Sequence, residues 1–369
     1  MRGGTSKGVF LRDADLPADQ DDRKRTILSI FGSPDRRQID GLGGADPLTS
    51  KVAIIGPPSN RGQLTYTFGQ VEIDRPSIDY ASPCGNIVSA VGAYAVYENL
   101  VTPVAPITRV RAYNTNLERI ITLEVPVANG VPVERGDYVI PGVPGSGARI
   151  LVDLSETAGG ACGALLPTGN VTDVFDLGGG DTIEVSLVDI ANPHVFVRAK
   201  DIGLTGTETL AQIDANKDLL ARLETIRGLA AIKFGLVTDP LRAKEDSRIT
   251  PMLAFVAPPA SYRDPARGVD VKASDIDLTS RLIFLERAHS TYAATSIACT
   301  GVAALLPGSI VNEVTALAAQ ERGVIRIGHV AGVFETESQV EFGDRAPMVR
   351  RATLGRTARR LLEGRVFID

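Results

Sequence analysis

The 369-residue sequence predicts an α+β protein with two β-rich domains, each wrapped around one apolar helix. Two observations lead to this prediction. Short apolar segments typical of strands recur along most of the chain, and each half contains one helical segment that is apolar or small on nearly every side. A helix without a polar face is buried rather than laid on a surface, so each half requires strands around its helix.

The first apolar helix is predicted over Asn86–Asn99, where "IVSAVGAYAVY" follows the turn "SPCGN" at 82–86. Ser82 and Pro83 mark the turn that precedes it. The second apolar helix is predicted over Thr295–Leu306, with the sequence "TSIACTGVAALL". A third helix, predicted over Ala211–Leu229, has apolar residues at helical spacing with polar residues between them.

Strands are predicted where apolar and β-branched residues cluster. These segments are 51–55, 65–74, 107–113, 119–127, 182–190 and 194–199. The glycine-rich segment "DLGGGD" at 176–181 is interpreted as a linker between domains. We therefore expect an N-terminal domain over 1–178, completed by the C-terminal segment 355–369, and a second domain over 179–354.

Composition and charge narrow the class of protein. The chain carries 39 Lys and Arg against 44 Asp and Glu, for a net charge of −5, and its basic residues are scattered, which argues against nucleic acid as a partner. No apolar run reaches the roughly 18 residues that a membrane span needs, and the start "MRGGTSKG" does not resemble a secretion signal. The three cysteines and three histidines form no disulfide or metal-binding pattern. A cytoplasmic enzyme without metal is the expectation.

Cys84 lies at the predicted start of the first apolar helix, where unpaired N–H groups and the helix dipole favour an anion. Thiols in such positions are favoured as thiolates, so Cys84 is a candidate reactive group beside an anion-binding turn. The alternative is a small buried residue in a glycine turn, since free cysteines are commonly inert.

Two further segments are rich in glycine. They are "RGGTSKG" at 2–8 and "QIDGLGGADPLTS" at 38–50, which precedes the strand 51–55. The segment "RGGTSKG" at 2–8 lacks the order of a phosphate-binding loop, but its N–H and hydroxyl groups suit a turn that holds a carboxylate. A simple glycine turn is the alternative. Lys51 begins the strand 51–55. It is either a solvated strand end or, if it points inward beside a substrate, a desolvated general base.

The segment "ANPHVFVRA" at 191–199 joins two predicted strands. Asn192 in this turn is able to present its amide to a carboxylate, or it merely caps the turn. His194 is interpreted mainly as structural.

Longer segments carry a resemblance to known proteins. "CGN" at a helix start, with "NPHV" in the second half, resembles the diaminopimelate epimerase superfamily. Six segments are similar to the PrpF family: "MRGGTSKG", "FGSPDRRQIDGLGGADPLTSKVAIIG", "CGN", "ALLPTGN", "GLTGTE" and "RTARRLLEG". The resemblance implies two similar domains, each a β-barrel around a central helix, with the active site in the cleft between them. It also implies cofactor-independent isomerisation of an unsaturated di- or tricarboxylate, such as 2-methylaconitate, methylitaconate, aconitate or 4-oxalomesaconate.

The resemblance also implies roles for individual residues. The acid–base pair of the family falls on Lys51 and Cys84, and either member could be the base. Carboxylate-binding turns fall on these positions of the chain: Thr5, Ser6, Lys7, Gly85, Asn86 and Asn192, with Thr295 and Ser296 at the start of the second apolar helix. No metal ligand is implied.

Two departures from these relatives qualify the expectation. The epimerases carry a second catalytic cysteine at the start of the second helix, whereas Cys299 lies about one turn inside the helix and is expected in the core. Relatives also have a short strand before "MRGGTSKG", so the native start is expected either here or upstream. A non-catalytic accessory protein that binds a dicarboxylate or an iron–sulfur hydratase is the alternative function, and the oligomeric state, including a homo-oligomer, is left open.

Overall fold

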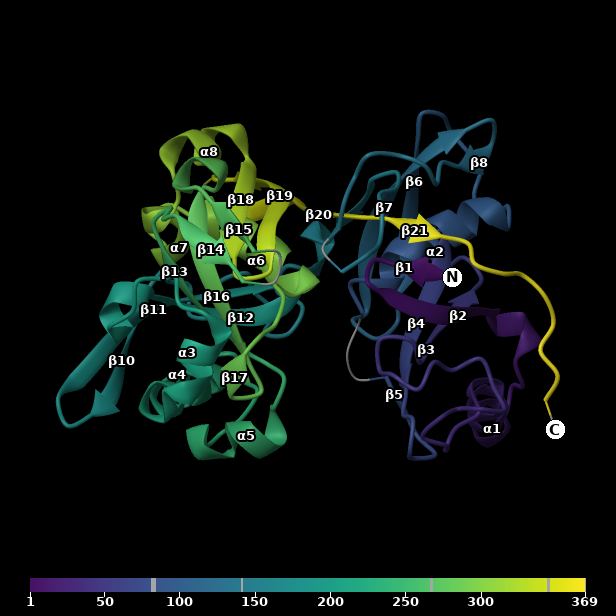
Figure 1. The fold of residues 1–369 in the computed structure, drawn as a ribbon, viewed down its shortest axis with the longest axis horizontal. Coiled ribbons are helices and arrows are strands. Elements are labelled where there is room, and N and C mark those ends of the chain that lie inside the picture. Colours follow the sequence, from purple (N-terminus) through teal and green to yellow (C-terminus); the bar gives the residue numbers. More distant parts are fainter. Residues whose placement is uncertain (81–83, 141, 266–267, 344–345, 369) are drawn as a thin grey trace. The chain divides into compact units, whose positions relative to one another are not determined.

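The computed structural model describes residues 1–80, 84–140, 142–265, 268–343 and 346–368. The chain forms two compact units (Figure 1). Unit 1 comprises Met1–Glu156 and Gly355–Asp369, and unit 2 comprises Thr157–Leu354. The division after Glu156 lies ahead of the boundary at 178 expected from the sequence.

The strands of unit 1 form a mixed sheet that curves around one helix. Strand β2 pairs in parallel with β3, β3 pairs antiparallel with β4, β4 in parallel with β6, and β6 and β9 pair antiparallel with β7. The elements are β1 (Arg2–Gly3), β2 (Ser6–Arg12), α1 (Gln20–Phe31), β3 (Lys51–Gly56), β4 (Leu64–Val71), β5 (Ile78–Asp79), α2 (Ile87–Tyr97), β6 (Ile107–Asn114), β7 (Arg119–Ala128), β8 (Val131–Pro132), β9 (Ile150–Asp153) and β21 (Ala358–Arg359).

Helix α2 is the first of the two predicted apolar helices, and it lies at the centre of unit 1. Every residue from Ile87 to Val96 except Tyr94 is buried, and the helix contacts strands on all sides, β1, β2, β3, β6, β7, β8, β9 and β21. A Cβ atom added at Gly92 would lie 2.7 Å from a methyl carbon of Val125, so only glycine lets β7 approach this closely. The expected burial of this helix is confirmed.

Helix α1 was not expected from the sequence. It begins at Asp19, whose carboxylate accepts N–H groups of the first turn. Only its second half is apolar, and Ile27 and Phe31 pack there against Val52 and Ile54 of β3. The charged first half, "QDDRKR", hides the helical period.

Unit 2 repeats the plan of strands around an apolar helix. Strands β11, β12, β13, β16, β18 and β19 are neighbours in one mixed sheet. The elements are β10 (Asp173–Gly178), β11 (Asp181–Ile190), β12 (Asn192–Arg198), α3 (Leu210–Ala215), α4 (Lys217–Lys233), α5 (Ala243–Asp246), β13 (Met252–Ala257), β14 (Tyr262–Asp264), β15 (Val269–Val271), β16 (Leu278–Phe284), β17 (Arg287–Ala288), α6 (Ala294–Ala304), α7 (Ile310–Val314), α8 (Leu317–Arg322), β18 (Val324–His329), β19 (Gly332–Glu341) and β20 (Met348–Arg356), which leads back to unit 1.

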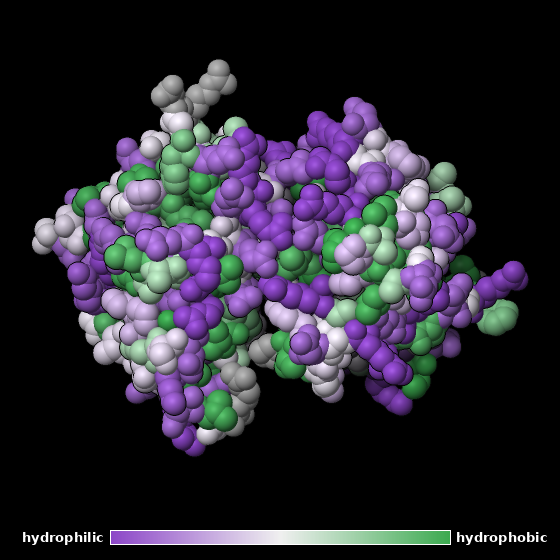
Figure 2. Space-filling model, turned by 90° about the horizontal axis from the view of Figure 1, so that it is seen from above, coloured by the Kyte–Doolittle hydropathy of each residue, from purple (hydrophilic) through white to green (hydrophobic). Residues whose placement is uncertain are grey.

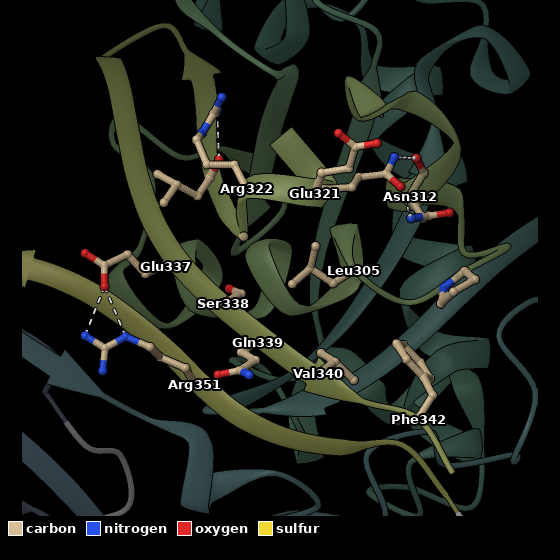
Figure 3. Close-up of a pocket in the computed structure, with 14 residues that line it drawn as sticks. Leu305, Asn312, Glu321, Arg322, Glu337, Ser338, Gln339, Val340, Phe342 and Arg351 are labelled. Atoms are coloured by element: carbon tan, nitrogen blue, oxygen red, sulfur yellow. Dashed lines mark hydrogen bonds and ion pairs between the residues drawn. The ribbon is translucent and has the colours of Figure 1, made fainter. Parts of the chain in front are cut away.

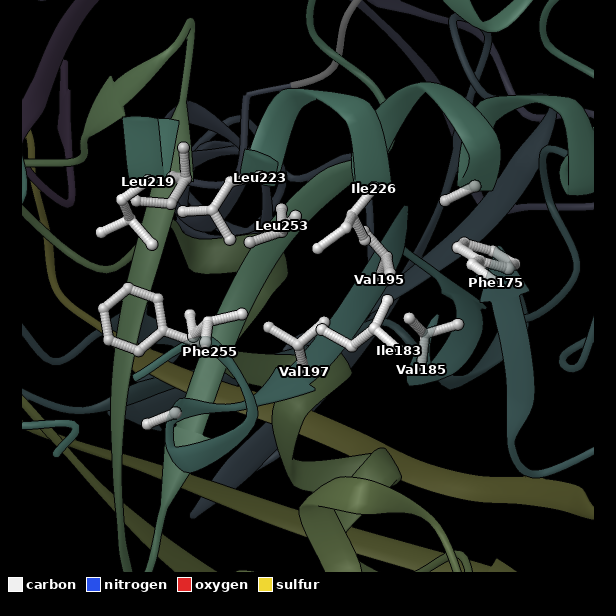
Figure 4. Close-up of a cluster of buried hydrophobic side chains, with 14 of the residues drawn as sticks. Phe175, Ile183, Val185, Val195, Val197, Leu219, Leu223, Ile226, Leu253 and Phe255 are labelled. Carbon is white, nitrogen blue, oxygen red and sulfur yellow. The ribbon is translucent and has the colours of Figure 1, made fainter. Parts of the chain in front are cut away.

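Helix α6 is the second predicted apolar helix. It is buried from Ser296 to Ala304 and contacts β11, β12, β18 and β19. The opposite face of the sheet is covered by α4, where Leu223 and Ile226 pack over Val195 and Leu253 (Figure 4). The sheet of unit 2 therefore has apolar side chains on both faces, and α6 is buried against one of them.

Two predictions for unit 2 were wrong. The segment "DLGGGD" is the turn of the β10–β11 hairpin rather than a linker, and its glycines take the positive φ angles that this turn requires. The helix expected over Ala211–Leu229 is broken at Asn216, whose side chain caps α4 by accepting the N–H of Leu219. The strands predicted in both units are confirmed as β3, β4, β6, β7, β11 and β12.

The visible face in Figure 2 is mostly hydrophilic, with small apolar areas dispersed over it. Among the helices of the described ranges, none is long and apolar enough to cross a membrane.

Candidate active site

The turn before α2 holds the candidate thiol. Cys84 is half-buried and carries a free thiol. Its carbonyl accepts the N–H of Val88 at 3.1 Å, and its Sγ lies 3.5 Å from the N–H of Ile87. The sulfur therefore lies against donors of the first helical turn, where an anion is favoured. Gly85 is half-buried in the same turn, whereas Ser82 and Pro83 lie outside the described residues.

Asn86 precedes the helix but does not cap it with its side chain. Its Oδ1 instead accepts a hydrogen bond from Arg356 Nε at 3.1 Å and a long one from the Thr5 N–H at 3.5 Å. Gly4, with φ of 51°, makes room for this arrangement, since a Cβ atom there would lie 2.3 Å from Asn86 Oδ1. The glycine turn 2–8 and the start of α2 are thus in direct contact.

The other residues of this turn have different surroundings. Ser6 is buried, and its hydroxyl has no hydrogen-bond partner in the described part of the chain. Lys7 is half-buried, and its N–H donates to the carbonyl of Leu48. Ser6 therefore offers an unused polar group at the predicted site.

Lys51 points inward from the start of β3 and is only 7% exposed. Its Nζ donates to Gln70 Oε1 at 2.6 Å and lies 5.3 Å from the centre of the Phe68 ring. Gln70 is fixed in turn by hydrogen bonds from its Nε2 to the carbonyls of Pro47 and Ser50. Within the described ranges, no carboxylate pairs with Lys51, and its side chain is buried rather than exposed at the strand end.

The Lys51 backbone and the start of α2 both lie close to Gly8, on the side where a Cβ atom would stand. A Cβ atom at Gly8 would lie 2.8 Å from the Lys51 carbonyl and 3.0 Å from Ile87 Cδ1. No hydrogen bond joins Lys51 to Cys84 among the residues that the structure describes. The fold thus brings the turn of Thr5 against the turn of Cys84 and Asn86, and it places Lys51 on β3, which pairs with β2 after Thr5.

Two residues near Cys84 were missed by the sequence analysis. Tyr66 on β4 is fully buried, and its hydroxyl has no partner in the described chain. Burial, and then the charge of Cys84, raise the pKa of Tyr66 well above its usual value. Arg356 is 7% exposed. Burial lowers the pKa of Arg356 to about 10, against the opposing charges of Tyr138 and Cys84. Both pKa shifts therefore include an interaction with Cys84.

The predicted residues of unit 2 form a second set at the start of α6. Asn192 Nδ2 donates to Thr295 Oγ1 at 3.3 Å. The Asn192 carbonyl lies 2.7 Å from His194 Nδ1, and Ser296 Oγ lies 2.7 Å from His194 Nε2. A carbonyl only accepts, so Nδ1 carries the proton and Ser296 donates to Nε2. His194 therefore links the strand to the helix.

Burial and hydrogen bonding decide which groups of this second set are available to bind an anion. Burial lowers the pKa of His194 to about 4, so the imidazole is neutral near pH 7. Ser296 is fully buried with its proton directed at His194, so its backbone N–H in the first helical turn is the group available to an anion. No side chain caps the N-terminus of α6. The structural interpretation of His194 agrees with its burial.

The other two cysteines are not candidates for a reactive thiol. Cys299 is fully buried, as expected, and burial raises the pKa of its thiol. Burial also raises the pKa of Cys162 to about 11, with a further contribution from Asp189. Both thiols are therefore protonated near neutral pH. In the described ranges, no group of three or more His, Cys, Asp or Glu side chains is placed to hold a metal ion.

An open pocket of about 530 Å³ lies elsewhere in unit 2, along β19 and the region of α7 and α8 (Figure 3). Its lining includes the ion pair between Glu337 and Arg351. None of the predicted site residues lines it, so its size alone does not make it the active site.

The fold and these two helix starts define an α+β protein in which each unit presents polar groups at the N-terminus of a buried helix. A family model described as "PrpF protein" matches residues 1–369. The chain belongs to the PrpF family.

Individual relatives match over the whole chain. It is 50% identical to a 3-methylitaconate isomerase of Eubacterium barkeri, across 100% of this chain and 96% of that protein. It is 36% identical to a 2-methyl-aconitate isomerase of Shewanella oneidensis, across 100% and 95%. A crystal structure of methylitaconate-delta-isomerase superimposes with a TM-score of 0.95 at 50% identity, covering 100% of this chain and 94% of that one.

Proposed function

We propose that this protein is a cofactor-independent isomerase that moves a proton and a double bond in an unsaturated di- or tricarboxylate. The chain is an isomerase in class, since relatives matched over its whole length are named isomerases. 2-Methylaconitate, methylitaconate and 4-oxalomesaconate are the candidate substrates. The relative named 3-methylitaconate isomerase is 50% identical, whereas a (4E)-oxalomesaconate Delta-isomerase of Novosphingobium is 38% identical.

The observation that carries the proposal is a pair of groups in unit 1. Lys51 is an inward-pointing amine with no carboxylate partner in the described chain, and Cys84 is a half-buried thiol at a helix N-terminus. A protein that only bound a dicarboxylate would need neither a buried amine nor a thiol at that place.

In the proposed reaction, the amine of Lys51 removes a proton from a carbon next to the double bond. The electron pair spreads over the conjugated system and a carboxylate as a dienolate. Cys84 then gives its proton to the other end of that system, which moves or rotates the double bond. Proton exchange with solvent restores the amine and the thiol. The reverse assignment of the two groups uses the same intermediate.

Backbone and side-chain donors would hold the carboxylates during this step. In unit 1 these are the hydroxyls of Thr5 and Ser6, Lys7, and the N–H groups of Gly85 and Asn86 at the start of α2. In unit 2, Asn192, Thr295 and the N–H of Ser296 are proposed to bind carboxylate in the same manner. Such donors stabilise the dienolate because its negative charge grows on the groups that they contact.

The test is incubation of the purified protein with each of the three acids, followed by proton NMR and by ultraviolet absorbance of the dienoate. We expect turnover of at least one acid without added metal or cofactor, and loss of turnover in Cys84→Ser and Lys51→Met. Binding of an acid without any conversion would overturn the proposal and favour a non-catalytic accessory protein.

A further inference from the structure

Unit 1 contains a buried positive charge for which the described chain provides no negative partner. Arg356, where β20 ends, is 7% exposed. No Asp or Glu forms an ion pair with it in the part of the chain that the structure describes. An unpaired charge is costly to bury, so this guanidinium is stabilised by hydrogen bonds to the protein, by water or by an anion from outside.

The described residues satisfy only part of the guanidinium. Nε donates to Asn86 Oδ1 at 3.1 Å, and Nη1 donates to the carbonyl of Gly355 at 2.9 Å. Nη2 has no hydrogen-bond partner among the described residues. The Gly4 backbone covers the aliphatic part of the side chain, since a Cβ atom at Gly4 would lie 3.1 Å from Arg356 Cδ. The free nitrogen thus belongs to an otherwise fixed side chain.

The surroundings of Arg356 Nη2 indicate which kind of ligand it would bind. Arg356 donates a hydrogen bond to Asn86, the residue directly before α2. The first N–H groups of α2 also favour an anion. Ser6, two residues from Gly4, adds a buried hydroxyl without a partner. A guanidinium, an unused hydroxyl and a helix N-terminus together suit a carboxylate.

We propose that Arg356 is a substrate-binding residue that holds one carboxylate of the di- or tricarboxylate through Nη2, while its Nε fixes the side chain of Asn86. This inference rests on the proposed function for the nature of the substrate. The carboxylate supplies the negative partner that Arg356 lacks among the described residues. If that carboxylate is conjugated with the reacting double bond, Arg356 also stabilises the dienolate, because the charge of the carboxylate grows as the proton leaves.

The protonation state of Arg356 agrees with this role. Although burial lowers the pKa of Arg356 to about 10, the guanidinium remains protonated at neutral pH. Its charge also interacts with Cys84. One fixed cation therefore acts both on the proposed carboxylate and on the thiol that handles the proton.

The experiment compares Arg356→Met with wild type and with Arg359→Met, which removes an exposed arginine three residues along the same segment. Isothermal titration calorimetry with tricarballylate, a saturated tricarboxylate that cannot isomerise, measures anion binding independently of turnover. Steady-state kinetics measure KM and kcat. We expect Arg356→Met to weaken tricarballylate binding and to raise KM by about tenfold or more, the effect of losing one hydrogen bond between charged groups. Arg359→Met should behave as wild type.

The outcomes separate this inference from the proposed function. Wild-type affinity and KM in a folded Arg356→Met would overturn the inference and leave Arg356 a packing residue. Absence of turnover in wild type would overturn the proposed function, while tricarballylate binding would still test Arg356. If Arg356→Met does not fold, Asn86→Asp carries the test, since it places a carboxylate beside Arg356 Nε within nearly the same shape. That internal anion should displace tricarballylate, and unchanged binding would overturn the inference.

Discussion

Substitution of Lys51 by Met tests the central step of the proposed chemistry. Methionine is similar in length and keeps the apolar stem beside Phe68, but it removes the amine and its 2.6 Å hydrogen bond to Gln70. Gln70 retains its two hydrogen bonds to the carbonyls of Pro47 and Ser50. The lost hydrogen bond is worth about 0.5–3 kcal/mol, and relief from burying the polar amine opposes that loss. We expect the free energy of unfolding to change by no more than about 2 kcal/mol.

The expected effect on catalysis is much larger. A positioned acid or base contributes about 10²- to 10⁴-fold to a rate, which corresponds to about 2.7–5.4 kcal/mol of activation free energy. The structure therefore predicts a variant that folds, binds the acid and has a kcat lower by at least about 100-fold. Lys24→Met, which removes an exposed lysine of α1, is the matched control and should keep full activity.

The assay follows incorporation of deuterium from solvent into the substrate by proton NMR, with thermal melts of the same samples. If Lys51 removes the first proton, exchange should vanish in Lys51→Met and persist to some degree in Cys84→Ser. The opposite pattern would reverse the two roles. A kcat within about threefold of wild type, with a normal melt, would refute any acid–base role for Lys51.

Four further predictions follow from the same geometry. Cys84→Ser should keep its fold and lose most of its kcat, because a hydroxyl is too weak an acid to replace the thiol; near-normal turnover would exclude Cys84. Cys299→Ser should keep kcat but melt at a lower temperature, since it puts a hydroxyl at a fully buried position of α6. Asn192→Ala should lower kcat/KM by about 10- to 100-fold if its amide holds a carboxylate, whereas a lower Tm with unchanged kinetics would make it a structural residue. Burial lowers the pKa of His194 from 6.5 to about 4, so the unfolded chain binds more protons between these values and stability should fall by about 2 kcal/mol from pH 7 to 5. His194→Gln should show a shallower decline in Tm over that range, and an equal decline would contradict the assignment.

The parts of the fold that could be predicted are those with a strong local pattern. Helices α2 and α6 are apolar on all sides, and this property both identifies them as helices and requires strands around them. The segment "DLGGGD" misled because glycines occur in linkers and in hairpin turns alike, and only the pairing of β10 with β11 distinguishes the two. Asn216 misled because a residue that caps one helix is able to stand inside an apparently continuous helical period.

The candidate site was predictable only where its residues are close in sequence. Cys84, Gly85 and Asn86 share one turn, so a pattern of residues identifies them together. Arg356 lies 270 positions from Asn86, and its contact with Asn86 depends on the return of the chain's last segment to unit 1. Tyr66 was missed for another reason, since its place in an apolar strand indicates burial but not the missing partner of its hydroxyl.

The charges of unit 1 provide an independent reason to expect an acidic ligand. The chain has more acidic than basic residues, 44 against 39, so a shortage of carboxylates cannot explain why two buried basic side chains have no acidic partner in the described ranges. Neither Lys51 nor Arg356 has an acidic partner in the described chain, although each is only 7% exposed. An internal carboxylate would neutralise them permanently and occupy the place of a substrate. In the proposed function, a bound acid provides the missing charge, and its binding energy is largest where proton removal creates further negative charge.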